Sequence, residues 1–320
     1  MADLSTDSID AVHTPVLVNE LIKVLEPKQE GELMIDATLG EGGHSMHFLS
    51  NFPGLRIIGI DADPEIQKIA KLRLQEFGDR ISFYSLWSHD FFSEYALKER
   101  PGIILIDLGV SLFHYEKSGR GFSFRRDEKL DMRISNSGHS ALDLISRLSE
   151  KELADLIFFN SDERFSRRIA REIVKARSLE PISSSKTLSL IVEKAVPPAY
   201  RRGPVHPATK TFQALRIAVN GELTRLEELL ENALRVLDTG GRMGVISFHS
   251  LEDRIVKNFF RKKNKDCICP PQTPICRCRG QRIVNILTKK GLRAGSDEVK
   301  ANPPSRSACL RAIEKLIDEE

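Results

Sequence analysis

Three glycines and a downstream aspartate form the most informative chemical pattern in the sequence. Gly40, Gly42 and Gly43 follow the apolar run Leu33–Asp36, and Asp61 ends the next apolar run. Glycines allow a sharp turn and a close approach of the backbone to a ligand, and a carboxylate about 20 residues downstream can accept hydrogen bonds from both hydroxyls of a ribose. The pattern predicts a nucleotide-type cofactor, with NAD and S-adenosylmethionine both still open.

A second carboxylate favours one of the two cofactors. Asp36 lies at the end of the first apolar run, directly before the glycine turn. An anionic side chain there suits the cationic methionyl part of S-adenosylmethionine better than a pyrophosphate. An NAD-linked oxidoreductase stays the alternative, because Gly40-x-Gly42-x-x-Ser45 nearly matches the dinucleotide fingerprint, although no catalytic pair for that reaction is recognisable.

Short runs rich in isoleucine and valine alternate with helical patterns. The expected strands cover residues 33–36, 56–61, 81–86, 102–110 and 242–247, with two closing strands over 282–288 and 307–313. Such alternation is typical of a parallel sheet covered by helices on both faces. We therefore predict the α/β class, with a doubly wound, Rossmann-like sheet of the S-adenosylmethionine-dependent methyltransferase type.

A helical stretch interrupts this alternation. From about residue 143 to 220 no strand signal occurs, and the expected helices cover residues 150–160, 162–177, 184–196 and 207–219. A long helix over 221–237 then returns the chain to the sheet. We predict a discontinuous methyltransferase domain, 1–125 and 217–320, interrupted by a helical insertion, 126–216, that meets the RNA substrate. A further helix is expected to begin at Ser250, with Asp253 completing its capping box.

The basic residues are unevenly distributed. A net charge of +3 and a pI near 8.5 are too low to indicate a nucleic-acid binder from composition alone. The expected insertion nevertheless concentrates cations, which either form a solvated helix face or contact RNA phosphates. We favour phosphate contact. The residues expected to make it are Arg164, Arg167, Arg168, Arg171, Lys210 and Arg216.

The remaining composition narrows the cellular setting. The first residues are polar without the apolar core of a signal peptide, and no run approaches the roughly 18 apolar residues of a membrane span. We expect a cytoplasmic protein with no membrane partner.

Four of the five cysteines lie between Cys267 and Cys278 as two pairs with one intervening residue each, whereas paired zinc ligands are more often separated by two residues. We expect reduced thiols and no bound metal, with a metal-binding loop as the alternative.

A series of motifs spread from residue 13 to about 312 resembles the RsmH (MraW) family. Among them are His13-Thr-Pro-Val16, Gly40-Glu-Gly-Gly-His-Ser45, Asp107-Leu-Gly-Val-Ser111, Arg120-Gly-Phe-Ser-Phe124 and Ser247-Phe-His-Ser-Leu-Glu-Asp-Arg254. Any one of these motifs is weak, but this many in order make a chance match very improbable.

The resemblance implies methylation of the N4 amine of a decoding-centre cytidine in 16S ribosomal RNA, with S-adenosylmethionine as donor and the small ribosomal subunit as partner. It also implies a methyltransferase domain interrupted by a helical domain. A non-catalytic ribosome-assembly factor that keeps the fold is the alternative, and the intact glycine loop and Asp61 argue against it. The oligomeric state stays open, a homodimer included.

The resemblance carries over to individual positions. The implied cofactor-binding residues are Gly42, Gly43, His44, Asp61, Trp87, Asp107 and His114. Trp87 stands where the family usually has phenylalanine, and His114 where it usually has a glutamine that contacts the cofactor; histidine can still make one hydrogen bond.

Two residues are the candidates for catalysis. Asp107, after the fourth strand, is expected in the active site as a cofactor contact or as the base for the amine proton, with a structural cap as the alternative. His249, after the fifth strand, is expected to line the pocket of the target base. Its alternative is local packing beside a helix capped by Ser250.

Overall fold

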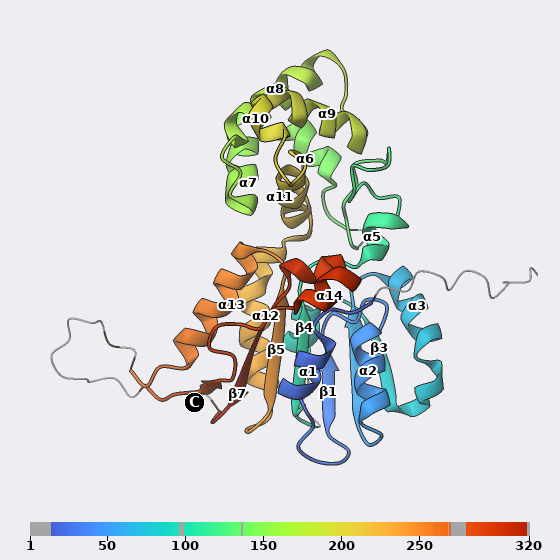
Figure 1. Cartoon of the computed structure of the whole chain (residues 1–320), viewed down its shortest axis with the longest axis vertical. Helices are drawn as coiled ribbons and strands as arrows, with labels where there is room; N and C mark the ends of the chain where they lie inside the picture. Colours follow the sequence, from blue (N-terminus) through green and yellow to red (C-terminus); the bar gives the residue numbers. More distant parts are fainter. Residues whose placement is uncertain (1–13, 96–98, 136, 268, 270–279, 319–320) are drawn as a thin grey trace, which may run out of the picture. The chain divides into compact units, whose positions relative to one another are not determined.

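The computed structural model describes residues 14–95, 99–135, 137–267, 269 and 280–318. The chain divides into two compact units, each of which is described by itself (Figure 1). The larger unit is discontinuous and comprises Met1–Gly109 and Arg225–Glu320, and the helical unit comprises Val110–Thr224. The helical unit thus begins earlier and ends later than the segment 126–216 outlined from the sequence. Within the described residues, no helix is both long and apolar enough to cross a bilayer.

A sheet of seven strands forms the centre of the larger unit (Figure 1). The strands are β1 (Leu33–Asp36), β2 (Arg56–Asp61), β3 (Ile81–Ser85), β4 (Ile103–Asp107), β5 (Arg242–Ser247), β6 (Val284–Ile286) and β7 (Cys309–Lys315). They lie in the order β3-β2-β1-β4-β5-β7-β6, and β7 runs antiparallel to both of its neighbours. The strand order reverses between β1 and β4, whose carboxyl ends therefore border the crevice where open α/β sheets bind ligands. The predicted α/β, doubly wound class is confirmed.

Helices cover both faces of the sheet. They are α1 (Val18–Val24), α2 (Gly43–Asn51), α3 (Pro64–Arg73), α4 (Ser88–Glu94), α12 (Glu222–Val236), α13 (Ser250–Lys263) and α14 (Ser296–Ala301), with 3-10 turns η2 (Gln75–Arg80) and η3 (Pro303–Ser307). Side chains alternate along a strand, so Ile35 packs with buried residues of α4, α12 and α13, while neighbouring Met34 packs with those of α1, α2 and α3. This double cover holds the carboxyl ends of the strands in place.

Capping side chains determine where two of these helices begin. Asp63 accepts a hydrogen bond from the Glu65 N–H at 3.0 Å, and Pro64 occupies the first turn of α3. The expected cap of α13 is wrong by one residue. His249, not Ser250, is the N-cap, and Glu252, not Asp253, completes the capping box.

The helical unit contains α5 (Leu112–Glu116), α6 (Ala141–Arg147), α7 (Glu150–Ser161), α8 (Ser166–Leu179), α9 (Ser185–Ala195), α10 (Pro198–Arg201) and α11 (Thr209–Asn220). α7 packs against α8 and α11, and α8 packs against α9. Leu153, Ile169 and Leu215 are fully buried in this small core. α8 begins later than the sequence indicated, because Asp162 takes a left-handed conformation (φ 49°) that ends α7.

Candidate active site

The glycine loop and Asp61 form one hydrogen-bonded unit. The Asp61 carboxylate accepts from the Gly40 N–H at 2.9 Å and from the Asp63 N–H at 2.8 Å. Gly42 has φ +78°, and a β-carbon there would lie 2.6 Å from Leu74 Cδ1, so a larger residue would both strain and crowd the turn. Each carboxylate oxygen can accept more than one hydrogen bond. Asp61 is therefore already oriented by the backbone and can still receive ribose hydroxyls.

Asp36 is a buried carboxylate at the end of β1. It accepts hydrogen bonds from Ser45 Oγ at 2.7 Å and from the Thr38 N–H at 3.3 Å. Burial raises the pKa of Asp36 to about 6, although these two hydrogen bonds act in the opposite direction; the nearby Asp61 carboxylate raises it further. A cation placed here would favour the ionised form, which suits the positively charged methionyl part of S-adenosylmethionine.

Asp107 and His44 meet at the end of β4. His44 Nε2 lies 2.9 Å from the Val16 carbonyl oxygen and must therefore carry a hydrogen, while Nδ1 lies 3.6 Å from Asp107 Oδ2. Asp107 Oδ1 is buried and has no hydrogen-bond partner among the described residues. Burial and the carboxylates of Asp36 and Glu252 raise the pKa of Asp107 well above its ordinary value. An unpartnered buried oxygen on a protonatable group is suited to receive a ligand hydrogen.

His249 is held by the first turn of α13. Its Nδ1 accepts from the Glu252 N–H at 3.4 Å, and its Nε2 lies 3.0 Å from Glu252 Oε1. Glu252 Oε2 in turn accepts from the Phe248 N–H at 2.9 Å. The ring therefore has a capping role and also lines a hollow with Ser250. Its part in binding a target base stays a prediction.

Trp87 is half-buried at the start of α4, and the Arg225 guanidinium lies 5.3 Å from its ring centroid. This cation–π contact occupies one face of the indole. An adenine could then stack only on the opposite face. Ser88, the next residue, donates a hydrogen bond to the Ala37 carbonyl and ties the start of α4 to the end of β1.

His114 belongs to the helical unit, apart from the other expected cofactor residues. It lies in α5, is 3% exposed, and its ring centroid is 5.2 Å from that of Phe122. This aromatic packing explains how the protein accommodates histidine at the position. A cofactor contact by His114 stays a prediction.

A basic face runs along α8 of the helical unit. Arg167, Arg168 and Arg171 are exposed, whereas Ile169 and Ile173 of the same helix are fully buried. This segregation makes α8 an amphipathic helix with a cationic outer side. Just before α8, the guanidinium of the equally exposed Arg164 lies 4.8 Å from the Phe165 ring centroid and 5.1 Å from that of Tyr200.

The two remaining predicted RNA contacts, Lys210 and Arg216, differ in exposure and in their hydrogen-bond partners. Lys210 is partly exposed and donates to the Asp162 carbonyl at 3.1 Å, which leaves further donors on its ammonium group. Arg216 is only 9% exposed, and Glu222 binds its Nε and Nη2 at 3.0 and 2.8 Å, with Tyr115 Oη 2.7 Å from Nη1. Arg216 is a buried structural residue, so we leave it out of the phosphate-contacting set.

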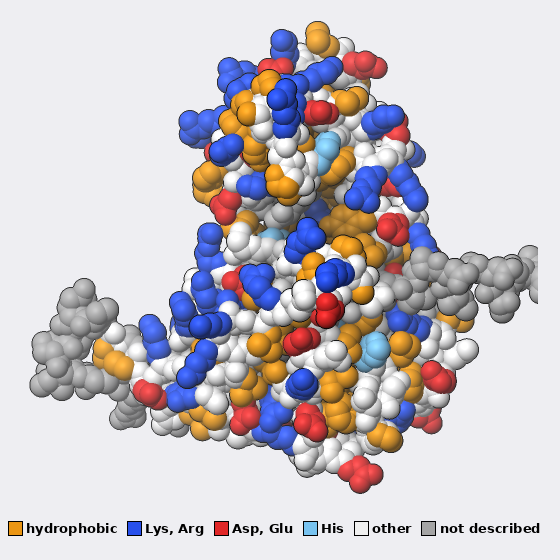
Figure 2. Space-filling view, viewed as in Figure 1, with side chains coloured by type: hydrophobic (Ala, Val, Ile, Leu, Met, Phe, Trp, Pro, Cys, Tyr) orange, Lys and Arg blue, Asp and Glu red, His pale blue; other side chains and the backbone are white. Residues whose placement is uncertain are grey.

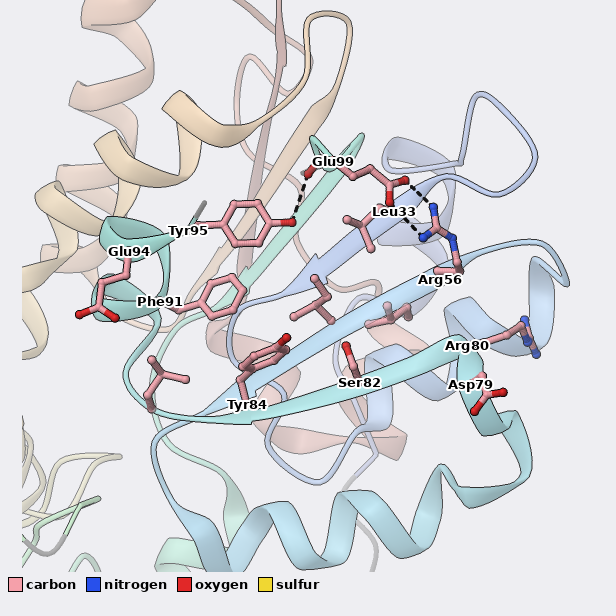
Figure 3. A pocket seen from close by; sticks show the side chains of 13 residues that line it. Leu33, Arg56, Asp79, Arg80, Ser82, Tyr84, Phe91, Glu94, Tyr95 and Glu99 are labelled. Carbon is pink, nitrogen blue, oxygen red and sulfur yellow. Dashed lines mark hydrogen bonds and ion pairs between the residues drawn. The ribbon is translucent and has the colours of Figure 1, made fainter. Parts of the chain in front are cut away.

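Another hollow of about 580 Å³ lies on the sheet face of the larger unit, beside β2 and β3 (Figure 3). Tyr84 and Phe91 point into it, and Arg56 binds Glu99 at its margin, where the Tyr95 hydroxyl donates to the Glu99 carbonyl. None of the residues expected in the active site lines this hollow. The carboxyl ends of β1 and β4, where the strand order reverses and the expected residues lie, are therefore the better candidate.

Fold and site together define a methyltransferase that uses S-adenosylmethionine: the sheet order with a reversed seventh strand, the glycine turn, Asp61 hydrogen-bonded to that turn, and the buried acid after β4. The chain belongs to the MraW methylase family, whose model matches residues 10–316. This membership rules out the oxidoreductase alternative.

Relatives of the chain carry a consistent name. A ribosomal RNA small subunit methyltransferase H of Treponema denticola is 53% identical over 95% of this chain and 98% of its own length. The protein of the same name from Syntrophotalea carbinolica is 45% identical over 95% and 98%. A solved methyltransferase of Streptococcus mutans in complex with SAH covers 93% of this chain and 95% of its own, with 13% identity and a TM-score of 0.39, a likeness too weak to carry an argument.

Sequence reasoning missed several residues that shape the site. Thr38 Oγ1 accepts from the Asp107 N–H at 2.6 Å, and Ser45 and Glu252 surround the buried acids. The spacing between His249 and Glu252 is that of a capping box, which would have indicated Glu252 if histidine had been considered as a cap. Cys276 and Cys278, the second cysteine pair of that loop, lie outside the described residues, so the expected reduced thiols and the metal-binding alternative both stay predictions.

Proposed function

We propose that this protein methylates the N4 amine of a decoding-centre cytidine in 16S ribosomal RNA, with the small ribosomal subunit as substrate and the cytoplasm as compartment. The single observation that supports this most strongly is the near-full-length similarity to the ribosomal RNA small subunit methyltransferases H. The arrangement of Asp36, Asp61 and Asp107 along one edge of the sheet supports it from the side of chemistry.

The larger unit provides the binding groups for the donor. S-adenosylmethionine, when bound, supplies a methyl group activated by the sulfonium. Asp61 accepts the two ribose hydroxyls, Gly42 and Gly43 let the backbone approach, and Asp36 stabilises the cationic end. Because the cytosine N4 lone pair is delocalised into the ring, most of the rate enhancement must come from alignment, which can contribute roughly 7–11 kcal/mol.

Asp107 is the residue best suited to orient the target amine. Its unpartnered Oδ1 can accept a hydrogen bond from the N4 amine, which directs the nitrogen lone pair towards the donor. Transfer leaves one surplus proton on N4. The raised pKa of Asp107 and the adjacent His44 Nδ1 give this proton a place at the Asp107–His44 pair.

The nature of the target atom can be tested with a cysteine-free protein. Methylation at C5 of a pyrimidine needs a thiolate adduct, whereas N4 methylation needs none. Cys309 is 3% exposed, and burial raises the pKa of its thiol, which disfavours a thiolate. We expect a variant with all five cysteines changed to alanine to leave N4-methylcytidine in unmodified small subunits, as mapped by mass spectrometry.

The matched control for this experiment is Asp107→Asn, which should bind S-adenosylmethionine but lose at least about 100-fold in turnover. A folded cysteine-free protein that binds the cofactor but transfers no methyl group would contradict the N4 mechanism. Activity in the wild type would at the same time exclude a purely non-catalytic assembly factor.

A further inference from the structure

The hollow that His249 and Ser250 line has a volume of about 520 Å³ and opens beside the carboxyl end of β5 in the larger unit. We call it the basic pocket, after its cationic lining residues Arg254, Lys257, Arg293 and Arg306. The first two belong to α13, Arg293 precedes α14, and Arg306 lies in η3. In Figure 2, Lys and Arg side chains gather over the part of the larger unit where Figure 1 labels α13. Neither the donor site nor the basic face of α8 includes these residues.

Two cations of the basic pocket, Arg293 and Arg306, have no carboxylate within ion-pair distance among the described residues. Asp253 is the one carboxylate among the lining residues, and Arg311, outside the lining, binds both of its oxygens at 2.7 and 3.1 Å. Burial alone would raise the pKa of Asp253, but the Arg311 guanidinium, with smaller contributions from Cys309 and Lys257, outweighs burial and holds that pKa below its ordinary value. Lys257 also acts on Asp253, whereas no carboxylate of the described part of the chain pairs with Arg293 or Arg306. Arg293 and Arg306 are exposed.

The chemistry of the lining fits a phosphodiester. Guanidinium groups bind phosphate oxygens in bidentate fashion, and the hydroxyls of Ser250 and Ser307 add neutral donors to the same wall. Cations held apart from carboxylates keep their full attraction for an anion and are costly to leave near one another without it. A small anionic group that enters this hollow would therefore be favoured.

The position of the basic pocket relates it to the reacting atoms. Asp107 pairs with Ile246 on the neighbouring strand, and Ser247, the next residue, pairs with Cys309. Ser247 and Cys309 both line the pocket. Neighbouring strands lie only about 5 Å apart, so the pocket begins at the same sheet edge as Asp107, within the reach of a nucleotide adjoining the target base.

We propose that the basic pocket binds a backbone phosphate of the RNA strand adjacent to the target nucleotide. This proposal rests on the proposed RNA substrate and assigns it a second contact region, in the larger unit itself. Phosphate contacts position a strand without reading its sequence. The pocket thereby holds the strand beside Asp107, while selection of the cytidine falls to groups that contact the base.

The test compares two pairs of charge-removing substitutions. Arg293→Gln/Arg306→Gln removes two cations from the pocket, and Lys289→Gln/Lys290→Gln removes two exposed cations of the same unit that do not line it. Binding to unmodified small subunits is measured, without turnover, from about 50 to 200 mM salt. We expect the pocket variant to bind about tenfold more weakly and to lose roughly 1.4 from the salt slope, at about 0.7 per single-strand phosphate. The control pair should stay within about twofold of wild type.

A charge-conserving variant and a measurement with inorganic phosphate distinguish the possible results of this test. Arg293→Lys/Arg306→Lys keeps the charge and should restore the salt slope while binding remains weaker, because lysine cannot form the bidentate contact. Equal losses in the pocket and control pairs, or a pocket variant with an unchanged slope, would overturn the proposal. Stabilisation of the wild type by inorganic phosphate together with an unchanged slope would identify a site for free anions instead. Failure of the proposed function appears separately, as absence of methyl transfer by the wild-type enzyme.

Discussion

The strand ends that carry the predicted donor site and the basic face of α8 hold their charged groups in opposite ways. Asp36 is buried and Asp61 half-buried, and their carboxylates already accept hydrogen bonds from Ser45, the Gly40 N–H and the Asp63 N–H. On α8, arginines extend from an exposed surface above a buried apolar side. Pre-oriented groups give large effects at single positions that depend little on salt, whereas exposed cations act additively and are screened. The difference indicates one site for a small ligand held in fixed geometry and one for a long polyanion.

The largest effect should follow from Asp61→Ala. It removes the acceptor that orients the Gly40 N–H, and with it the two charge-assisted hydrogen bonds that we propose to the ribose. We expect S-adenosylmethionine affinity to fall by roughly 2–3 kcal/mol, about 30- to 150-fold. Titration calorimetry measures this, with the exposed Asp79→Ala as control. Unchanged affinity in Asp61→Ala would show that Asp61 does not bind the ribose. The expected difference in effect size between this site and α8 would then be lost.

An intermediate effect should appear in the pH dependence of stability. The folded-state pKa of Asp36, about 6, exceeds its unfolded value near 3.8, so the folded state binds more protons between them. The stability of the cofactor-free protein should therefore fall as pH rises from about 4 to 6, by up to about 3 kcal/mol.

Asp36→Asn tests this expectation. It should flatten that pH dependence and stabilise the cofactor-free protein near neutral pH, while weakening S-adenosylmethionine binding because the cationic end loses its partner. Thermal unfolding at several pH values, with and without cofactor, separates the two effects. A pH profile identical to that of the wild type would show that Asp36 is ordinarily solvated.

The smallest effect per residue should come from α8. Replacing Arg167, Arg168 and Arg171 with glutamine should reduce the salt slope of RNA binding by roughly 2, at about 0.7 per lost phosphate contact, and leave cofactor affinity unchanged. The control changes Lys151, Lys186 and Lys194, exposed residues of the same unit, to glutamine. If both triple variants give the same slope, the α8 arginines only solvate their helix.

Much of the sheet could be predicted from the sequence. The strands 33–36, 56–61 and 242–247 appear with the predicted bounds, because short β-branched runs in a buried parallel sheet have few alternative conformations. The glycine loop and Asp61 could be recognised in the sequence equally well, because one strand–turn–helix unit sets their spacing.

The features that could not be predicted from the sequence depend on contacts between segments that are far apart in the chain. In the sequence, Arg216 resembles a surface cation, but in the structure its guanidinium binds Glu222 and Tyr115. The basic pocket collects residues from α13, the loop before α14 and η3, which no local pattern connects. Cys309 lies 62 residues after Ser247 in the chain but pairs with it at the end of β5.

The insertion of the helical unit between two neighbouring strands has a consequence for the order of folding. β4 and β5 are direct neighbours, yet the entire helical unit separates them in sequence. Closing so long an unstructured loop is entropically unfavourable and slow, whereas a helical unit built from local contacts can fold early and restrict the chain between the two strands. Refolding should thus begin in the helices, and sheet formation should wait for them. A substitution in the core of the helical unit, such as Ile169→Ala, would then slow acquisition of the cofactor site without touching it.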